Sequence, residues 1–255
     1  MCGITGFVDL HTLLVMIDCA RGKSIMLTLI FIAISLLRVE SSSCSNTSFT
    51  WVANESKENP YFWKSPSFNW DATNTLAVFS SVTESADRLE MRDYAQGLGI
   101  DVVRGVSPGG IDMTDEDERK KWVQDTIDYV KDQGINGVNV DYEGHDPMKT
   151  SYFNSLVIDL CNEMHSSIPG SQISVDVPIY PEYEGRNYDY KGFADACDSL
   201  FVMAYDGIFW DNVQCAVTNV KCSNACASLE IVEYGIQAYL NLGVPSKALN
   251  LGLPW

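Results

Sequence analysis

The sequence predicts an α/β protein in which parallel strands alternate with helices, as in a (β/α) barrel. Short runs rich in β-branched and apolar residues recur at intervals of roughly 25 to 35 residues, and longer amphipathic stretches separate them. A doubly wound, dinucleotide-binding sheet is the weaker alternative, because no G-x-G-x-x-G pattern follows the first strand. The seven candidate strands are residues 49–53, 75–79, 101–106, 137–141, 172–177, 199–204 and 248–253.

Three stretches between these strands have the spacing of amphipathic helices. In the first, Thr114 is the expected N-cap, acidic residues fill the first turn, and Gly134 ends the pattern. The second ends near residues 169–170, and the third covers residues 228–242. We expect the apolar stripes of the first two to face the core; they consist of Val123, Ile127 and Val130, and of Phe153, Leu156, Val157, Leu160 and Met164.

Composition excludes two classes of protein. The chain has 255 residues, with 17 Lys and Arg against 34 Asp and Glu, a formal net charge of −17. A surface that binds phosphate needs an excess of basic residues, so we expect no nucleic-acid partner. A hydrophobic content of 46% excludes an intrinsically disordered chain. The length suits one large α/β domain or two small ones, and we expect one domain because the sequence contains no visible linker or long repeat.

The amino-terminal part has the pattern of a secretory signal. An apolar run at residues 26–37 lies between Lys23 and Arg38 and precedes small residues at 41–43. Such a run, at about 1.5 Å per residue, is too short to cross a hydrocarbon layer about 30 Å thick. A buried helix of the fold is the alternative. We expect residues 1–43 to be a targeting segment, residues 44–255 to form the folded domain, and no membrane attachment once the signal is removed.

Further features fit an oxidising compartment, either lysosomal or extracellular. Glycosylation sequons begin at Asn46 and Asn54. An even number of cysteines follows residue 43, which permits disulfides: Cys44, Cys161, Cys197, Cys215, Cys222 and Cys226. A zinc site is the competing interpretation, but no C-x-x-C pair or nearby histidine supports it, so we expect no metal.

The residues that indicate chemistry lie in the fourth candidate strand and just after it. With the period of two that strands have, Asn139, Asp141 and Glu143 share one face. The other face is apolar or aromatic and carries Val138, Val140 and Tyr142. In a barrel the apolar face meets the helices, so the polar face meets the interior. The two carboxylates then lie at the carboxyl end of the strand, where barrel enzymes have their active sites.

A half-exposed antiparallel strand would show the same alternation, but the neighbouring helices favour a parallel sheet covered on both faces. A calcium loop does not fit, because its ladder of Asp and Asn around a central Gly is absent. Adjacent enclosed carboxylates separate their titrations. We expect Glu143 to retain a proton and act as a general acid, with Asp141 as its charged partner. That arrangement is typical of glycoside hydrolysis.

Three segments resemble glycoside hydrolase family 18, the chitinase-like family. Residues 135–143 resemble its D-G-x-D-x-D-x-E signature, residues 201–206 its M-x-Y-D segment, and residues 249–255 the G-x-P-x-Y/W end of its seventh strand. Residues 170–177 and 190–206 are most similar to the di-N-acetylchitobiase group of the family. The resemblance covers residues 48–255.

This resemblance implies a (β/α)8 TIM-type barrel and a retaining, substrate-assisted reaction on β-1,4-linked N-acetylglucosamine. Glu143 would protonate the glycosidic oxygen, Asp141 would bind the acetamido N–H, and Tyr205 would bind the acetamido oxygen. Further sugar contacts would come from Asn139, Met203 and Asp206. The expected partner is an N-acetylglucosamine oligosaccharide bound by a monomer, without a cofactor.

The sequence also departs from the family pattern. Asn136 and Asn139 stand where the signature has aspartates, and residues 104–107 replace the S-x-G-G motif of strand three. The sequence ends at Trp255, so we expect a barrel that is truncated after strand seven. A non-catalytic, chitinase-like binding protein or an inactive truncated paralogue is the alternative. The presence of Glu143 favours an enzyme.

Overall fold

Seven parallel strands form one sheet in the order β1-β2-β3-β4-β5-β6-β7. The computed structural model describes residues 48–52, 62–66, 68–79, 86–144, 146–205 and 227–252. The strands are β1 (Phe49–Val52), β2 (Thr75–Val78), β3 (Asp101–Val106), β4 (Gly137–Val140), β5 (Gln172–Val177), β6 (Ser199–Met203) and β7 (Leu249–Gly252). Each strand pairs with the one before it in the chain, which is the order of a (β/α) barrel rather than of a doubly wound sheet. The predicted fold class is confirmed. Among the described strands, β1 and β7 each pair on one side.

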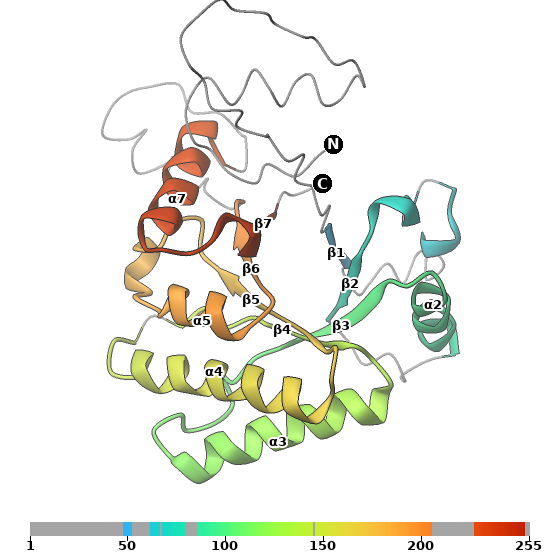
Figure 1. Cartoon of the computed structure of the whole chain (residues 1–255), viewed down its shortest axis with the longest axis horizontal. Coiled ribbons are helices and arrows are strands. Elements are labelled where there is room, and N and C mark those ends of the chain that lie inside the picture. Colours follow the sequence, from blue (N-terminus) through green and yellow to red (C-terminus); the bar gives the residue numbers. More distant parts are fainter. Residues whose placement is uncertain are drawn as a thin grey trace, which may run out of the picture.

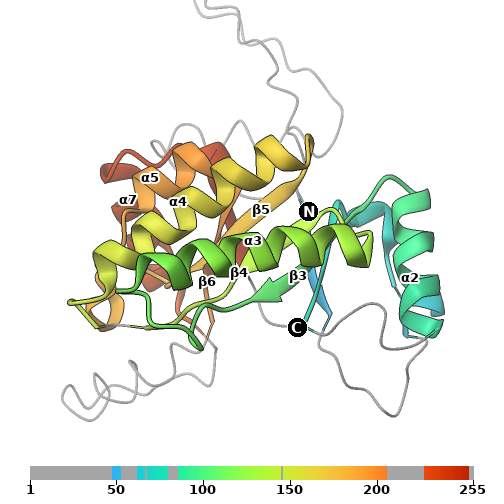
Figure 2. The same ribbon diagram turned by 90° about the horizontal axis from the view of Figure 1, so that it is seen from below.

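Helices cover the outer face of the curved sheet (Figure 1). They are α2 (Ala86–Gly97), α3 (Glu116–Gln133), α4 (Thr150–Ser167), α5 (Tyr190–Ala196) and α7 (Leu229–Asn241). Short 3-10 helices lie in the connections: η1 (Phe62–Lys64), η2 (Trp70–Ala72), η4 (Tyr183–Gly185) and η5 (Ser246–Ala248). Helices α3, α4 and α5 pack side by side below the sheet (Figure 2).

Helix α3 begins at a side chain that caps its first N–H groups and ends at a glycine. Gly134 ends the helix in the left-handed region, with φ of 60°, as the sequence predicts. The predicted N-cap, Thr114, is wrong by one residue. Asp115 is the cap, because its Oδ1 accepts hydrogen bonds from the N–H groups of Asp117 (2.8 Å) and Glu118 (3.2 Å). The Thr114 hydroxyl instead donates to Asp112 Oδ1 (2.8 Å).

The core lies between the sheet and the helices. All the residues predicted for the apolar stripes of α3 and α4 are buried, which confirms both stripes. They meet the outward-facing side chains of the central strands, which are Val138, Val140, Ile173, Val175 and Val177. Burial of each such side chain contributes roughly 1.5–3 kcal/mol, so this layer is the main source of stability.

Aromatic side chains from distant strands meet on the inner face of the sheet. The Phe49 ring of β1 lies 5.2 Å from the Phe201 ring of β6, between centroids, and Trp51 stacks on Phe79 at 4.4 Å. Because β1 and β6 are far apart in the strand order, their side chains can touch only if the sheet curves toward a closed barrel. Gly105 on β3 makes room for this cluster, because a Cβ there would lie 3.0 Å from the Trp51 ring.

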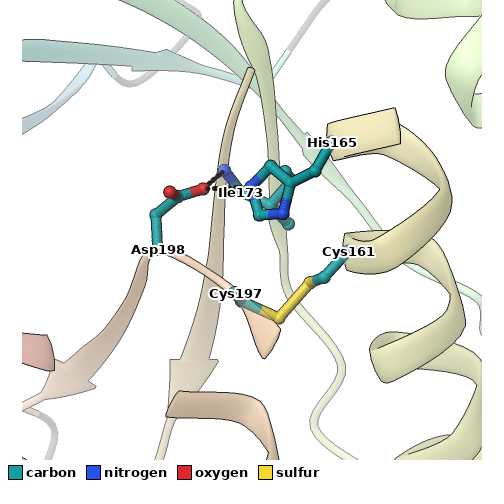
Figure 3. The surroundings of a disulfide bond; sticks show 5 residues. All are labelled: Cys161, His165, Ile173, Cys197 and Asp198. Atoms are coloured by element: carbon teal, nitrogen blue, oxygen red, sulfur yellow. Dashed lines mark hydrogen bonds and ion pairs between the residues drawn. A yellow bond between two sulfur atoms is a disulfide. The ribbon is translucent and has the colours of Figure 1, made fainter. Parts of the chain in front are cut away.

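A disulfide between Cys161 on α4 and Cys197, directly after α5, fastens two outer helices together (Figure 3). The neighbouring Asp198 carboxylate accepts a hydrogen bond from the N–H of Ile173 on β5 (2.7 Å) and contacts His165 Nε2 (3.0 Å). This bridge confirms that the chain contains a disulfide. The other cysteines of the domain, the sequons at Asn46 and Asn54, and the targeting segment 1–43 lie outside the described residues. In the described part of the chain, no helix has both the length and the apolar character needed to cross a membrane.

Candidate active site

Strand β4 presents its polar side chains to the barrel interior. Val138 and Val140 are fully buried toward the helices, and the Tyr142 ring packs 4.7 Å from Phe153 of α4. Because side chains alternate along a strand, Asn139, Asp141 and Glu143 point to the opposite, inner face. The backbone supports this arrangement past the end of the strand, since the Asp141 N–H donates to the Val106 oxygen of β3 (2.8 Å).

Strand β5 adds a second polar row, which the sequence analysis missed. The register pairs Asn139 with Ser174 and Val140 with Val175, so one further step places Asp141 beside Asp176. Asn139 Nδ2 donates to both Ser174 Oγ and Asp176 Oδ1, each at 2.9 Å. All three of these side chains are buried.

The enclosed carboxyl groups have perturbed titrations. Burial raises the pKa of Asp176 well above its usual range, the charge of Asp141 raises it further, and the hydrogen bond from Asn139 opposes the rise. Burial also raises the pKa of Asp141, as does the charge of Glu143, whereas Arg186 lowers it. The sequence predicts that Glu143 holds the retained proton, and this stays a prediction. In the structure, burial acts on Asp141 and Asp176, because these are the enclosed carboxyls, whereas the Glu143 side chain is 59% exposed.

Arg186 connects Glu143 to the segment that follows β5. Its Nη2 donates to Glu143 Oε2 (2.9 Å) and to Glu184 Oε2 (2.8 Å), and its side chain is only 4% exposed. Burial acts to lower the pKa of Arg186, but the hydrogen bonds to the two carboxylates raise it overall. Arg186 is therefore a fixed cation beside the acidic row.

Two tyrosines anchor the segment that carries Arg186. The Tyr188 hydroxyl donates to the backbone oxygens of Tyr142 (3.2 Å) and Gly144, on either side of Glu143. The Tyr190 hydroxyl donates to the oxygens of Pro181 (2.8 Å) and Arg186. Burial raises the pKa of both tyrosines, so both stay protonated donors. Residues 181–190 thus form a braced segment over the carboxyl end of β4.

The remaining predicted sugar-binding residues follow strand β6. Met203 is the last residue of this strand and pairs with Gly252. Alternation from the inward Phe201 puts Met203 on the inner face as well, and Tyr205 follows two residues after the strand ends. Carboxyl ends of parallel strands meet at one end of a barrel, so these residues share that end with Asp141. Asp206 lies outside the described residues.

Two of the departures from the family pattern, Asn136 and Arg104, have structural roles. Asn136 Oδ1 accepts hydrogen bonds from the Val102 N–H (2.9 Å) and Gln96 Nε2 (2.8 Å), at the base of β4. Arg104 turns outward, and its guanidinium lies 4.3 Å from the centre of the Tyr129 ring. Within the described ranges, no group of three or more His, Cys, Asp or Glu could hold a metal ion.

Comparison with known sequences identifies relatives over most of the chain. Residues 109–255, more than half of the chain, match the sequence model of the family described as Glycosyl hydrolases family 18. Di-N-acetylchitobiase of Rattus norvegicus is 32% identical over 197 residues, covering 76% of this chain and 50% of that protein. Di-N-acetylchitobiase of Homo sapiens is 30% identical over 197 residues, covering 76% and 48%. The chain therefore spans about half the length of the curated relatives it matches.

Solved structures share the fold. A class V chitinase from Nicotiana tobaccum superposes with a TM-score of 0.63 at 18% identity, covering 82% of this chain and 66% of that chain. A family GH18 chitinase from Cycas revoluta, solved as a complex with allosamidin, gives a TM-score of 0.57 at 20% identity, covering 72% and 62%. At such identities the likeness supports the architecture alone.

Proposed function

The chain belongs to the glycosyl hydrolases of family 18, and we propose that it hydrolyses β-1,4-linked N-acetylglucosamine in chitobiose, chitin oligosaccharides or the core of N-glycans. The observation that carries the proposal is the pair of neighbouring acids Asp141 and Glu143 just past the carboxyl end of β4, the end where barrel enzymes have their sites. The relatives named di-N-acetylchitobiase support the substrate class.

In the proposed reaction, Glu143 protonates the glycosidic oxygen while the acetamido oxygen of the substrate attacks the anomeric carbon and forms an oxazolinium ion. Asp141 accepts a hydrogen bond from the acetamido N–H and stabilises the positive charge. Tyr205 donates to the acetamido oxygen, and Asn139, Met203 and Asp206 contribute to sugar binding. Water then opens the ring with Glu143 as the base, so the anomeric configuration is retained. The reaction needs no cofactor.

Arg186 positions the proposed acid. Its hydrogen bond engages Oε2 of Glu143, so the other carboxyl oxygen, Oε1, can face the substrate. The hydroxyl of Tyr188 holds the backbone on both sides of Glu143. A general acid must lie within hydrogen-bond reach of the leaving oxygen, and these two contacts restrict where it can lie.

The test is Glu143→Gln, with Glu184→Gln as the matched control. Both glutamates accept a hydrogen bond from Arg186 Nη2, and both are about half exposed, but only Glu143 follows β4. Chitobiose hydrolysis should fall roughly 10²–10⁴-fold in Glu143→Gln and stay near wild type in Glu184→Gln. Cellobiose, which lacks the acetamido group, should not be cleaved. Equal turnover of the two disaccharides would contradict the substrate-assisted route.

A carbohydrate-binding protein without turnover is the second candidate. The observation that favours it is the ion pair between Arg186 and Glu143, which engages the proposed acid (2.9 Å). Calorimetry with chitin oligosaccharides separates the two functions. Under this alternative, wild type and Glu143→Gln bind equally well and neither releases sugar.

We also propose that the protein enters the secretory pathway, with residues 1–43 removed, residues 44–255 retained, and glycans at Asn46 or Asn54. The sequence pattern alone supports this. Mass spectrometry of the protein from eukaryotic cells should find a start near residue 44 and glycosidase-sensitive mass. An intact, unglycosylated amino terminus would contradict the route.

A further inference from the structure

Asp176 is a buried acid for which the proposed reaction has no use. It is 5% exposed and lies on β5, where its register partner on β6 is the apolar Phe201. Its one described hydrogen bond comes from Asn139 Nδ2 (2.9 Å). A buried carboxyl that is neither paired with a cation nor saturated with donors is costly, and a Val or Leu would fill the same space more cheaply.

Among the described residues, the groups around Asp176 are negative or neutral. Asp141 and Glu143 face it from β4 and the residues that follow, and Asn139 and Ser174 are neutral. Within the described residues, Asp141 Oδ1 and Asn139 Oδ1 are buried without a hydrogen-bond partner. Two adjacent enclosed carboxyl groups separate their titrations, so over the pH range between the two midpoints one of them keeps a proton.

Arg186 determines which of the two carboxyl groups, Asp141 or Asp176, keeps the proton. Arg186 favours the charged form of Asp141, whereas the influences on Asp176 are burial, the charges of Asp141 and Glu143, and the opposing hydrogen bond from Asn139. The proton therefore belongs on Asp176 and the negative charge on Asp141.

We propose that Asp176 is a positioning residue of the active site, a carboxylic acid that keeps its proton so that the single negative charge of the enclosed pair stays on Asp141. The proposal rests on the proposed function, in which anionic Asp141 accepts the acetamido N–H and stabilises the oxazolinium ion. No proton moves from Asp176 during the reaction. If the single proton of the pair sat on Asp141 instead, Asp141 would lose the charge that the intermediate requires.

The first experiment needs no activity. Carboxyl ¹³C NMR follows the titration of Asp176 in the wild-type chain and in Asp141→Asn. We expect Asp176 to titrate at higher pH than Asp141, and its midpoint to fall in Asp141→Asn, because that change removes the neighbouring charge. An Asp176 midpoint at or below that of Asp141, or one unmoved by Asp141→Asn, would overturn the proposal.

The second experiment measures binding of an N-acetylglucosamine thiazoline, a mimic of the oxazolinium ion, across pH by calorimetry. Above the Asp176 midpoint the wild-type site gains a second enclosed negative charge, so its affinity should depart from the value that it has at lower pH. In Asp176→Asn, a neutral isostere, this change should disappear. Ser174→Ala is the matched control, because it removes the other Asn139 contact without changing charge, and its pH profile should match that of wild type.

The two experiments separate the possible failures. Binding with the same pH profile in wild type and Asp176→Asn would overturn the positioning role while leaving the proposed function intact. Absence of thiazoline binding in every folded variant would overturn the proposed function, and the NMR titration would then decide whether Asp176 holds the proton. If Asp176→Asn fails to fold, the NMR comparison of wild type with Asp141→Asn still tests the proposal.

Discussion

Arg186 is the one cation that acts on both Asp141 and Glu143 in the described site. Since it lowers the pKa of Asp141, its removal leaves only the influences that raise this pKa. In Arg186→Gln we therefore expect the pKa of Asp141 to rise, and the acid limb of the pH–rate profile to move to higher pH. Arg186→Lys keeps the charge and should show a smaller shift, although its single ammonium cannot reproduce the planar fork. An unchanged acid limb in Arg186→Gln would show that Arg186 does not act on Asp141.

The hydroxyl of Tyr188 holds the backbone on either side of Glu143, so removing it shows how far the position of the Glu143 side chain depends on that backbone. Tyr188→Phe removes the hydroxyl that holds the Tyr142 and Gly144 oxygens, and should lower the free energy of unfolding by about 0.5–1.5 kcal/mol. Turnover should fall more than substrate binding, because the acid loses its fixed place. Tyr190→Phe is the comparison, since its hydroxyl bonds Pro181 and Arg186 and not the residues beside Glu143. Similar losses of turnover in both variants would argue against a specific role for Tyr188.

At the scale of elements, the strands were predicted more accurately than the helices. Each of the seven begins and ends within one residue of its predicted bounds wherever the chain is described, because runs of β-branched residues between helical stretches leave little choice. Helix α2 escaped prediction because its sequence buries only Met91 and Ala95, too few residues for a visible stripe. Helix α5 is too short for periodicity to reveal it.

The same reasoning explains which parts of the site were predicted. The inward row of β4 follows from alternation within one strand, which a sequence displays directly. Ser174 and Asp176 show the same alternation on β5, but a lone carboxyl gave no reason to single them out. Arg186 and Tyr188 belong to a segment with little regular structure, and only the folded chain brings it over β4. Residues that act across such tertiary contacts leave no local pattern.

The disulfide is an element-scale brace whose strength can be measured. Cys161 and Cys197 are separated by 36 residues, and closing a loop of that size should stabilise the fold by up to about 4 kcal/mol. The double variant Cys161→Ala with Cys197→Ala should melt at a clearly lower temperature than wild type. Reducing agent should lower the melting temperature of wild type toward that of the variant. Equal melting temperatures of wild type with and without reductant would contradict a stabilising bridge.

For the molecule as a whole, Asp176 makes stability depend on pH. Folding raises its pKa, so its contribution to stability is fully present below the ordinary value of about 3.9 and is lost as the pH rises toward and through the folded pKa. Asp176→Asn does not titrate. We expect it to gain stability over wild type as the pH rises above about 4, by at most about 1.4 kcal/mol per pH unit. Urea unfolding at a series of pH values measures this, with Ser174→Ala as a control whose difference from wild type should not change with pH.

The strictly sequential strand order also bears on how the chain folds during synthesis. Every strand pairs with its predecessor, so each new β/α unit leaving the ribosome finds its neighbour already made. At roughly 5–20 residues per second, the 36 residues from Cys161 to Cys197 take about 2–7 s to synthesise. Both cysteines precede β7. If the chain folds in the oxidising lumen proposed above, the bridge locks α4 to the α5–β6 connection before β7 is translated, and the sheet gains this covalent link while it is still being built.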